Sequence, residues 1–229
     1  LAAMLQVDNA FVSLVAAKAL LQIDAKEAIP LLVPVLSRRN DWSPLKVVAM
    51  FEPAGADIAA EAIAKAACEA TPEIGARLIR HLAATQSQHA LPPLRALLKK
   101  GTPPDDVLSA CLFLFGECSD PRDVATIRTH LSHPTWFVRL QAASALGKVG
   151  VEEDEGRLIA LLSDEHWWVC YRAAEALSNL PWMTIERLTQ LCEALTTVEA
   201  KEHLLPFMAQ SHVKTDQPNA AIPPQVRTA

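Results

Sequence analysis

Hydrophobic positions repeat along most of this chain. The stretch "HPTWFVRLQAASALGKVG" at residues 133–150 returns as "DEHWWVCYRAAEALSNLP" at residues 164–181, so Trp136 aligns with Trp167 at a separation of 31 positions. The same step toward the N-terminus recovers further copies, with one step of 33 where residues 99–106, "KKGTPPDD", add two positions. One aligned column, apolar at every step, reads Leu20, Phe51, Leu82, Phe115, Leu146 and Leu177. The chain is therefore a tandem repeat of one short unit.

Each unit predicts a pair of helices. Two apolar stretches per copy have the i, i+3, i+4, i+7 spacing of a helix. Glycines such as Gly116, Gly147 and Gly150 fall between the two stretches and are interpreted as helix breakers. Because one helix pair cannot bury its own apolar face, consecutive pairs must stack. The pattern predicts an all-α fold, a right-handed α-solenoid (α-α superhelix) of about six helix pairs of about 31 residues each.

The extent of the repeat predicts the domain boundaries. We expect one solenoid domain over residues 1–209 and an extended or disordered C-terminal tail over residues 210–229. The tail segment holds three prolines and no repeat columns, so it offers little to a packed core.

At the N-terminus the chain is expected to begin inside a partial repeat. Leu1 and Leu5 fall in the columns of Leu32 and Leu36. Residues 1–7 should therefore occupy the second-helix position of an earlier unit. Since the chain also opens without an initiator methionine, we expect it to be a fragment of a larger protein.

Composition and charge narrow the class of protein. Hydrophobic residues make up 51% of the chain and aromatic residues 5%, which favours helix. The net charge of −5 gives no general attraction to nucleic acid or to an anionic membrane. Five cysteines without a C-x-x-C pair indicate reduced thiols, and hence a cytoplasmic location. No apolar run reaches the roughly 18 to 20 residues of a membrane span, so no membrane contact by this segment is expected.

The motif "VRLQAASALGKVG" at residues 138–150 resembles the HEAT-repeat family. The resemblance is to the short form common in bacterial proteins and in the phycobilisome lyase subunits, and it covers residues 1–209. It implies an armadillo-type α-solenoid fold and a habit of binding other macromolecules. It implies no particular reaction.

Common catalytic signatures are missing from the sequence. There is no G-x-S-x-G, H-E-x-x-H, P-loop or Cys–His pattern. His130, His133 and His166 are spaced to lie along one edge of the stack, but no cysteine or carboxylate completes a zinc-ligand spacing. We therefore expect no enzyme, no metal site and no cofactor.

Three functions compete. The leading hypothesis is a non-catalytic scaffold that presents a curved surface to a partner protein. A HEAT-like DNA glycosylase or other nucleic-acid-binding protein would need a clustered basic groove, whereas this chain has no Lys/Arg tract of five or more. A tetrapyrrole (bilin) lyase subunit would need a second subunit and a chromophore pocket. We expect a protein partner, no nucleic acid, and a monomeric chain.

Aromatic and basic residues indicate the surface that the partner would contact. Trp136, Trp167 and Trp168 lie at the entrance to first helices, either packed against the next repeat or forming an aromatic binding rim. In HEAT-like stacks the second helices line the concave side, which the resemblance implies here. Arg157, on a second helix, should then lie in the groove, and Arg128 at its border. We predict that these five residues bind the partner.

Overall fold

The structure is a computed structural model that describes residues 1–38 and 56–215. Its described residues form helices and turns without a strand, which confirms the all-α prediction. Phe51 and the first half of its unit, residues 39–55, lie outside the described residues. The helices are α1 (Ala10–Ile23), α2 (Ala25–Arg38), α4 (Ala56–Glu69), α5 (Pro72–Ala83), α6 (Leu91–Lys100), α7 (Asp105–Cys118), α8 (Val124–Thr129), α9 (Trp136–Val149), α10 (Glu155–Leu161), α11 (Trp167–Asn179), α12 (Ile185–Ala194) and α13 (Val198–Thr215).

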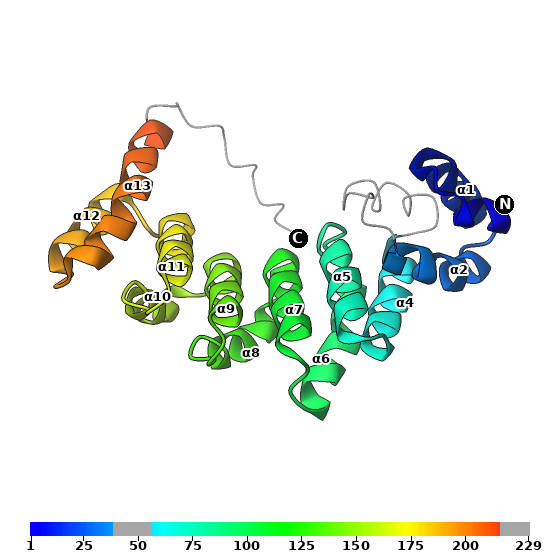
Figure 1. Cartoon of the computed structure of the whole chain (residues 1–229). Helices are drawn as coiled ribbons and strands as arrows, with labels where there is room; N and C mark the ends of the chain where they lie inside the picture. The colour runs from blue at the N-terminus through cyan, green and yellow to red at the C-terminus, as the bar shows by residue number, and fades with distance from the viewer. Residues whose placement is uncertain (39–55, 216–229) are drawn as a thin grey trace, which may run out of the picture.

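The helices stack in two layers along a curved path (Figure 1). First helices α5, α7, α9 and α11 pack side by side in one layer, and second helices α6, α8 and α10 form the other. The repeat column predicted from the sequence lies between the layers, where Leu82, Phe115, Leu146 and Leu177 are buried. Each pair thus buries its apolar face against the next, as an α-solenoid requires.

Glycine brings the first helices into backbone contact. A Cβ atom at Gly116 would lie 2.8 Å from the Cα of Ala145, and one at Gly147 would lie 2.7 Å from the Cα of Ala176. Both glycines lie inside helices, so their interpretation as breakers was wrong, whereas Gly150 does cap the end of α9. Their absent side chains let α7, α9 and α11 approach more closely than other residues would permit.

The closely spaced layer faces the inside of the arc. In Figure 1 helices α5, α7, α9 and α11 line the concave side, and α6, α8 and α10 lie on the convex side. The expectation that second helices line the groove was therefore wrong. The physical reason is spacing: a stack of paired helices curves toward the layer whose helices lie closer together, and the alanine and glycine columns belong to the first helices.

Both ends of the described chain are helical. A 3₁₀ turn, η1 (Ala2–Gln6), packs on α1 and α2 and buries Leu5. At the other end α13 continues to Thr215, so the segment expected to be extended from residue 210 begins as helix. Residues 216–229 lie outside the described residues. Among the described helices, none has the length and hydropathy needed to cross a membrane.

Gly147→Ala should destabilise the fold because the added methyl group collides with the backbone of α11. We expect the free energy of unfolding to fall by about 1–2 kcal/mol, the range of modest overpacking in a core. Gly156→Ala is the matched control, because a Cβ there meets nothing within 4 Å. Denaturant unfolding should show the control unchanged or stabilised by up to about 1 kcal/mol. Equal stability of the two variants would contradict the close-approach account.

Candidate functional site

Three tryptophans stand at the starts of α9 and α11. Trp136 is the first residue of α9, and Trp167 and Trp168 are the first two of α11. Their side chains are 37%, 54% and 49% exposed, respectively. Indole is the largest apolar side chain in the protein. Three exposed indoles on one side of a small domain are unusual and call for an explanation.

A buried arginine fixes the loops that carry these tryptophans. Arg139 donates two hydrogen bonds to the carboxylate of Asp164, at 2.7 and 2.8 Å. It also donates to the carbonyl oxygens of His133 and Pro134, at 2.9 and 3.0 Å. The bonds to Asp164 raise the pKa of Arg139. One guanidinium therefore ties the loop before α9 to the loop before α11, so the tryptophans are presented on a rigid base.

Ring contacts link each repeat to the next. Trp136 stacks on His166, with ring centroids 3.9 Å apart and planes 1° from parallel. Trp167 lies edge-on to His203 of α13, at 5.9 Å, and stacks on Tyr171 at 5.4 Å. The expected packing against the next repeat is thus present for Trp136 and Trp167.

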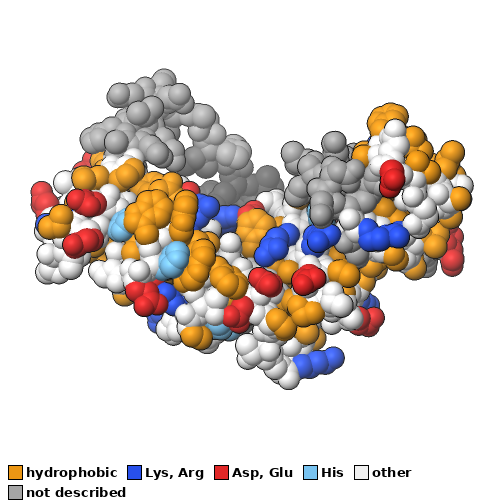
Figure 2. Space-filling model, in the orientation of Figure 1, with side chains coloured by type: hydrophobic (Ala, Val, Ile, Leu, Met, Phe, Trp, Pro, Cys, Tyr) orange, Lys and Arg blue, Asp and Glu red, His pale blue; other side chains and the backbone are white. Residues whose placement is uncertain are grey.

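Packing between repeats does not cover these rings. Trp168 meets Trp167 edge-on at 4.7 Å and Tyr171 at 6.2 Å, and about half of each indole still faces solvent. Figure 2 shows a broad hydrophobic patch with histidine side chains beside it over the region of α11. We call the surface formed by Trp136, Trp167, Trp168 and Tyr171 the aromatic surface. Contiguous exposed patches of this kind mark interaction sites.

Arg128 and Arg157 have a structural role that was not predicted. Arg128 on α8 donates two hydrogen bonds, of 2.6 and 2.8 Å, to the buried carboxylate of Asp154. Arg157 on α10 donates to the same carboxylate at 3.2 Å, and so does the backbone N–H of Val151 at 3.1 Å. Both arginines come from the convex layer, and their contact with a partner stays a prediction.

The same arrangement recurs one unit earlier. Arg95 on α6 donates to Asp123 at 2.6 and 2.7 Å and pairs with Asp120 at 2.8 Å. The sequence could have predicted these two Arg–Asp pairs, because both partners recur with the repeat. Asp123 and Asp154 are 31 positions apart, and Arg95 and Arg128 are 33 positions apart. These pairs tie each second helix to the turn that precedes the next one.

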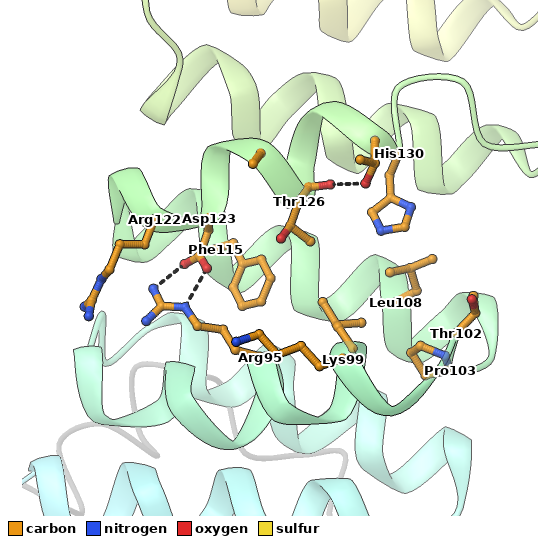
Figure 3. Close-up of a pocket in the computed structure, with 14 residues that line it drawn as sticks. Arg95, Lys99, Thr102, Pro103, Leu108, Phe115, Arg122, Asp123, Thr126 and His130 are labelled. Carbon is orange, nitrogen blue, oxygen red and sulfur yellow. Dashed lines mark hydrogen bonds and ion pairs between the residues drawn. The ribbon is translucent and has the colours of Figure 1, made fainter.

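A cavity of about 720 Å³ opens between α6, α7 and α8 (Figure 3). Leu108 and Phe115 of α7 form its floor, and His130 faces Leu108 across it. The cavity lies where the repeat lengthens by two residues, at the loop after α6. Arg95, Lys99 and Arg122 line this cavity with one carboxylate, that of Asp123, which binds Arg95, so the lining carries a net positive charge.

Histidine clustering does not produce a metal site in the described part of the chain. The rings of His130 and His133 meet edge-on at 6.0 Å, and His166 stacks on Trp136 instead of joining them. Within residues 1–38 and 56–215 no group of three or more His, Cys, Asp or Glu is placed to hold a metal ion.

Comparison with known proteins gives a family match and similar solved structures. Residues 100–178 match the family described as HEAT repeats. No curated protein matches the chain. One similar solved structure is the complex of CpcE and CpcF of phycocyanin lyase from Nostoc sp. PCC7120, at 18% identity and a TM-score of 0.48, covering 91% of this chain and 92% of that one. Another is an engineered protein, at 15% identity and a TM-score of 0.46, covering 92% of this chain and 95% of that one.

Asp154→Ala should strongly destabilise the protein because it leaves the partly buried Arg128 without its partner. We expect a loss of about 3 kcal/mol in the free energy of unfolding, as for other broken buried ion pairs. Arg157→Ala, which removes only the more exposed partner of the same carboxylate, should cost no more than about 0.5 kcal/mol. Thermal or urea unfolding of the three proteins measures the difference, and similar losses in both variants would contradict this account.

The effect of Asp154→Ala should also depend on pH. Burial raises the pKa of Asp154, but hydrogen bonds from Arg128 and Val151 outweigh it and leave the pKa below its usual value. A carboxyl whose pKa is lowered by folding stabilises the protein above its unfolded pKa and loses that contribution as pH falls through the folded one. The stability difference between wild type and variant should therefore shrink below about pH 4. A constant difference between pH 7 and pH 3 would contradict the assignment.

Proposed function

We propose that this chain, whose residues 100–178 match the family of HEAT repeats, is a non-catalytic scaffold whose aromatic surface binds a partner protein. The observation that carries the proposal is the pair of adjacent indoles at Trp167 and Trp168, 54% and 49% exposed. Tryptophan is the residue most enriched at the energetic centres of protein interfaces.

Rigidity of this surface supports binding. Trp167 is held by Tyr171 and His203, and the loop before it by the bonds of Arg139 to Asp164. Side chains that are already ordered lose little conformational entropy when a partner covers them. When a partner covers the exposed indole area, the hydrophobic effect adds roughly 25 cal/mol per Å² of buried area to the favourable free energy of binding.

Charge favours a protein over nucleic acid as partner. The chain has a net charge of −5, and several arginines are neutralised by internal carboxylates, as with Arg95, Arg128 and Arg139. A glycosylase needs several unpaired cations along one groove to hold phosphates. We accordingly propose a monomeric scaffold that binds protein and not DNA.

Cysteine chemistry fits a reducing compartment. All five cysteines are free thiols in the structure. Burial raises the pKa of Cys111 to about 12 and that of Cys118 to about 11. Such thiols are inert core residues, and we propose a cytoplasmic location on this ground.

The test is loss of one specific partner when the indoles are removed. The full chain should capture a protein from a lysate of its source organism, and the identified protein should then be purified and titrated against variants. We expect Trp167→Ala/Trp168→Ala to weaken its binding by at least tenfold, since single tryptophans at interface centres contribute about 2 kcal/mol or more. Circular dichroism should stay unchanged, because both indoles lie at the surface.

Phe11→Ala is the matched control. Phe11 is an aromatic side chain that is 73% exposed, but it lies on α1 at the other end of the stack. Phe11→Ala should bind the partner as tightly as the wild type does. A further variant, Arg157→Glu, reports whether the convex side contributes to partner binding. Normal binding by the double tryptophan variant would overturn the proposal. A second subunit captured together with a bound bilin would instead support the lyase alternative.

A further inference from the structure

A cavity of about 350 Å³ adjoins the aromatic surface. It lies between the loop that precedes α11 and the first turns of α13, and Trp167 and His203 line it together with three carboxylates, those of Asp164, Glu165 and Glu199. Its volume is at the lower end for ligand pockets, which suits one side chain of a partner better than a large cofactor.

The carboxylates leave this cavity negatively charged. Arg139 is bound bidentately by Asp164 and approaches Glu165 at 3.2 Å, so one positive charge faces two negative ones there. Glu165 remains 84% exposed at its side chain. Glu199, in the first turn of α13, is exposed and makes no ion pair with any described residue. A net charge of about −2 therefore lines the cavity at neutral pH.

Trp167 presents exposed indole beside this cavity. Tyr171 stacks on the indole with planes 20° from parallel, and Trp168 and His203 meet it edge-on. The residue nevertheless remains 54% exposed. The face of an indole attracts cations because of the quadrupole of its π-system.

We propose that this cavity binds an arginine side chain of the partner protein, with the guanidinium against the exposed indole of Trp167 and within reach of Glu165 and Glu199. This inference rests on the proposed function, because it specifies what the aromatic surface binds. A guanidinium is planar and weakly hydrated, so it stacks on aromatic rings and also donates several hydrogen bonds to carboxylates. One guanidinium can therefore stack on the indole and donate hydrogen bonds to both carboxylates at the same time.

Other occupants fit this cavity less well. An acidic group would meet like charge on Glu165 and Glu199, and a purely apolar side chain would strip water from them without replacing its hydrogen bonds. The 720 Å³ cavity between α6 and α8 has the opposite charge, because Arg95, Lys99 and Arg122 line it together with a single carboxylate, Asp123. Of these two cavities, the one beside Trp167 is therefore the one that suits a cation.

Two short peptides that differ only in charge test the proposal. The probe is Ac-Gly-Arg-Gly-NH₂, and the control is the same peptide with citrulline, which keeps the shape of arginine without its charge. Titration is followed by the NMR shift of the Trp167 indole N–H, assigned by its loss in Trp167→Leu. We expect saturable binding of the arginine peptide and at least about tenfold weaker binding of the citrulline peptide, as a desolvated cation–π contact predicts.

Charge variants locate the site. Glu199→Gln and Glu165→Gln should each weaken binding of the arginine peptide several-fold, and together they should abolish it. Glu73→Gln removes an exposed carboxylate from α5, outside the cavity, and should leave binding unchanged.

The possible outcomes separate the two proposals. Equal shifts with both peptides, or no saturable shift with either, overturn the arginine site. They do not bear on whether the aromatic surface binds a purified partner, because the double tryptophan variant tests that separately. Equal binding of a lysine peptide overturns the choice of arginine. Equal loss of binding in Glu73→Gln and in the cavity variants would show only a general charge effect and would also overturn the site.

Discussion

The contact of a glycine on one first helix with the backbone of the next determines most of this structure. Where Gly116 meets Ala145 and Gly147 meets Ala176, the glycine places no side chain between the helices and leaves room only for the methyl group of the alanine. This layer therefore has the shortest spacing in the stack, and the layer outside it must spread to keep the helices paired. Curvature, and with it the identity of the concave face, follows from four small residues.

The wider convex layer is held by a different kind of interaction. Its helices are tied by arginines that reach to buried carboxylates in the following turn, as from Arg95 to Asp123 and from Arg128 to Asp154. Buried ion pairs add little net stability compared with apolar packing, but they are expensive to break. They fix the register between units, while apolar columns between the layers supply most of the free energy of folding.

Sequence periodicity was sufficient to predict the helices, the two-helix unit and the stacking. It did not predict which layer is concave, because both helices of a unit carry an apolar stripe and the difference lies in side-chain volume. Gly147 was interpreted as a breaker because glycine in isolation disfavours helix; only the neighbouring Ala176 shows why it is needed inside one. The three tryptophans were identified from the sequence, but their exposure was not, since it depends on how far the next repeat overlaps each ring.

The candidate site arises from the same constraints as the fold. Arg139 must satisfy Asp164 and two loop carbonyls to hold adjacent repeats together, and in doing so it offsets a single negative charge. Glu165, which also accepts a hydrogen bond from Arg139, and Glu199 then leave the cavity beside Trp167 negative. A repeat that needed only packing between units would be served by one aromatic ring at each helix start. The second indole at Trp168 and the excess of carboxylates exceed that need, and both fit the partner that we propose, one with an apolar, positively charged segment.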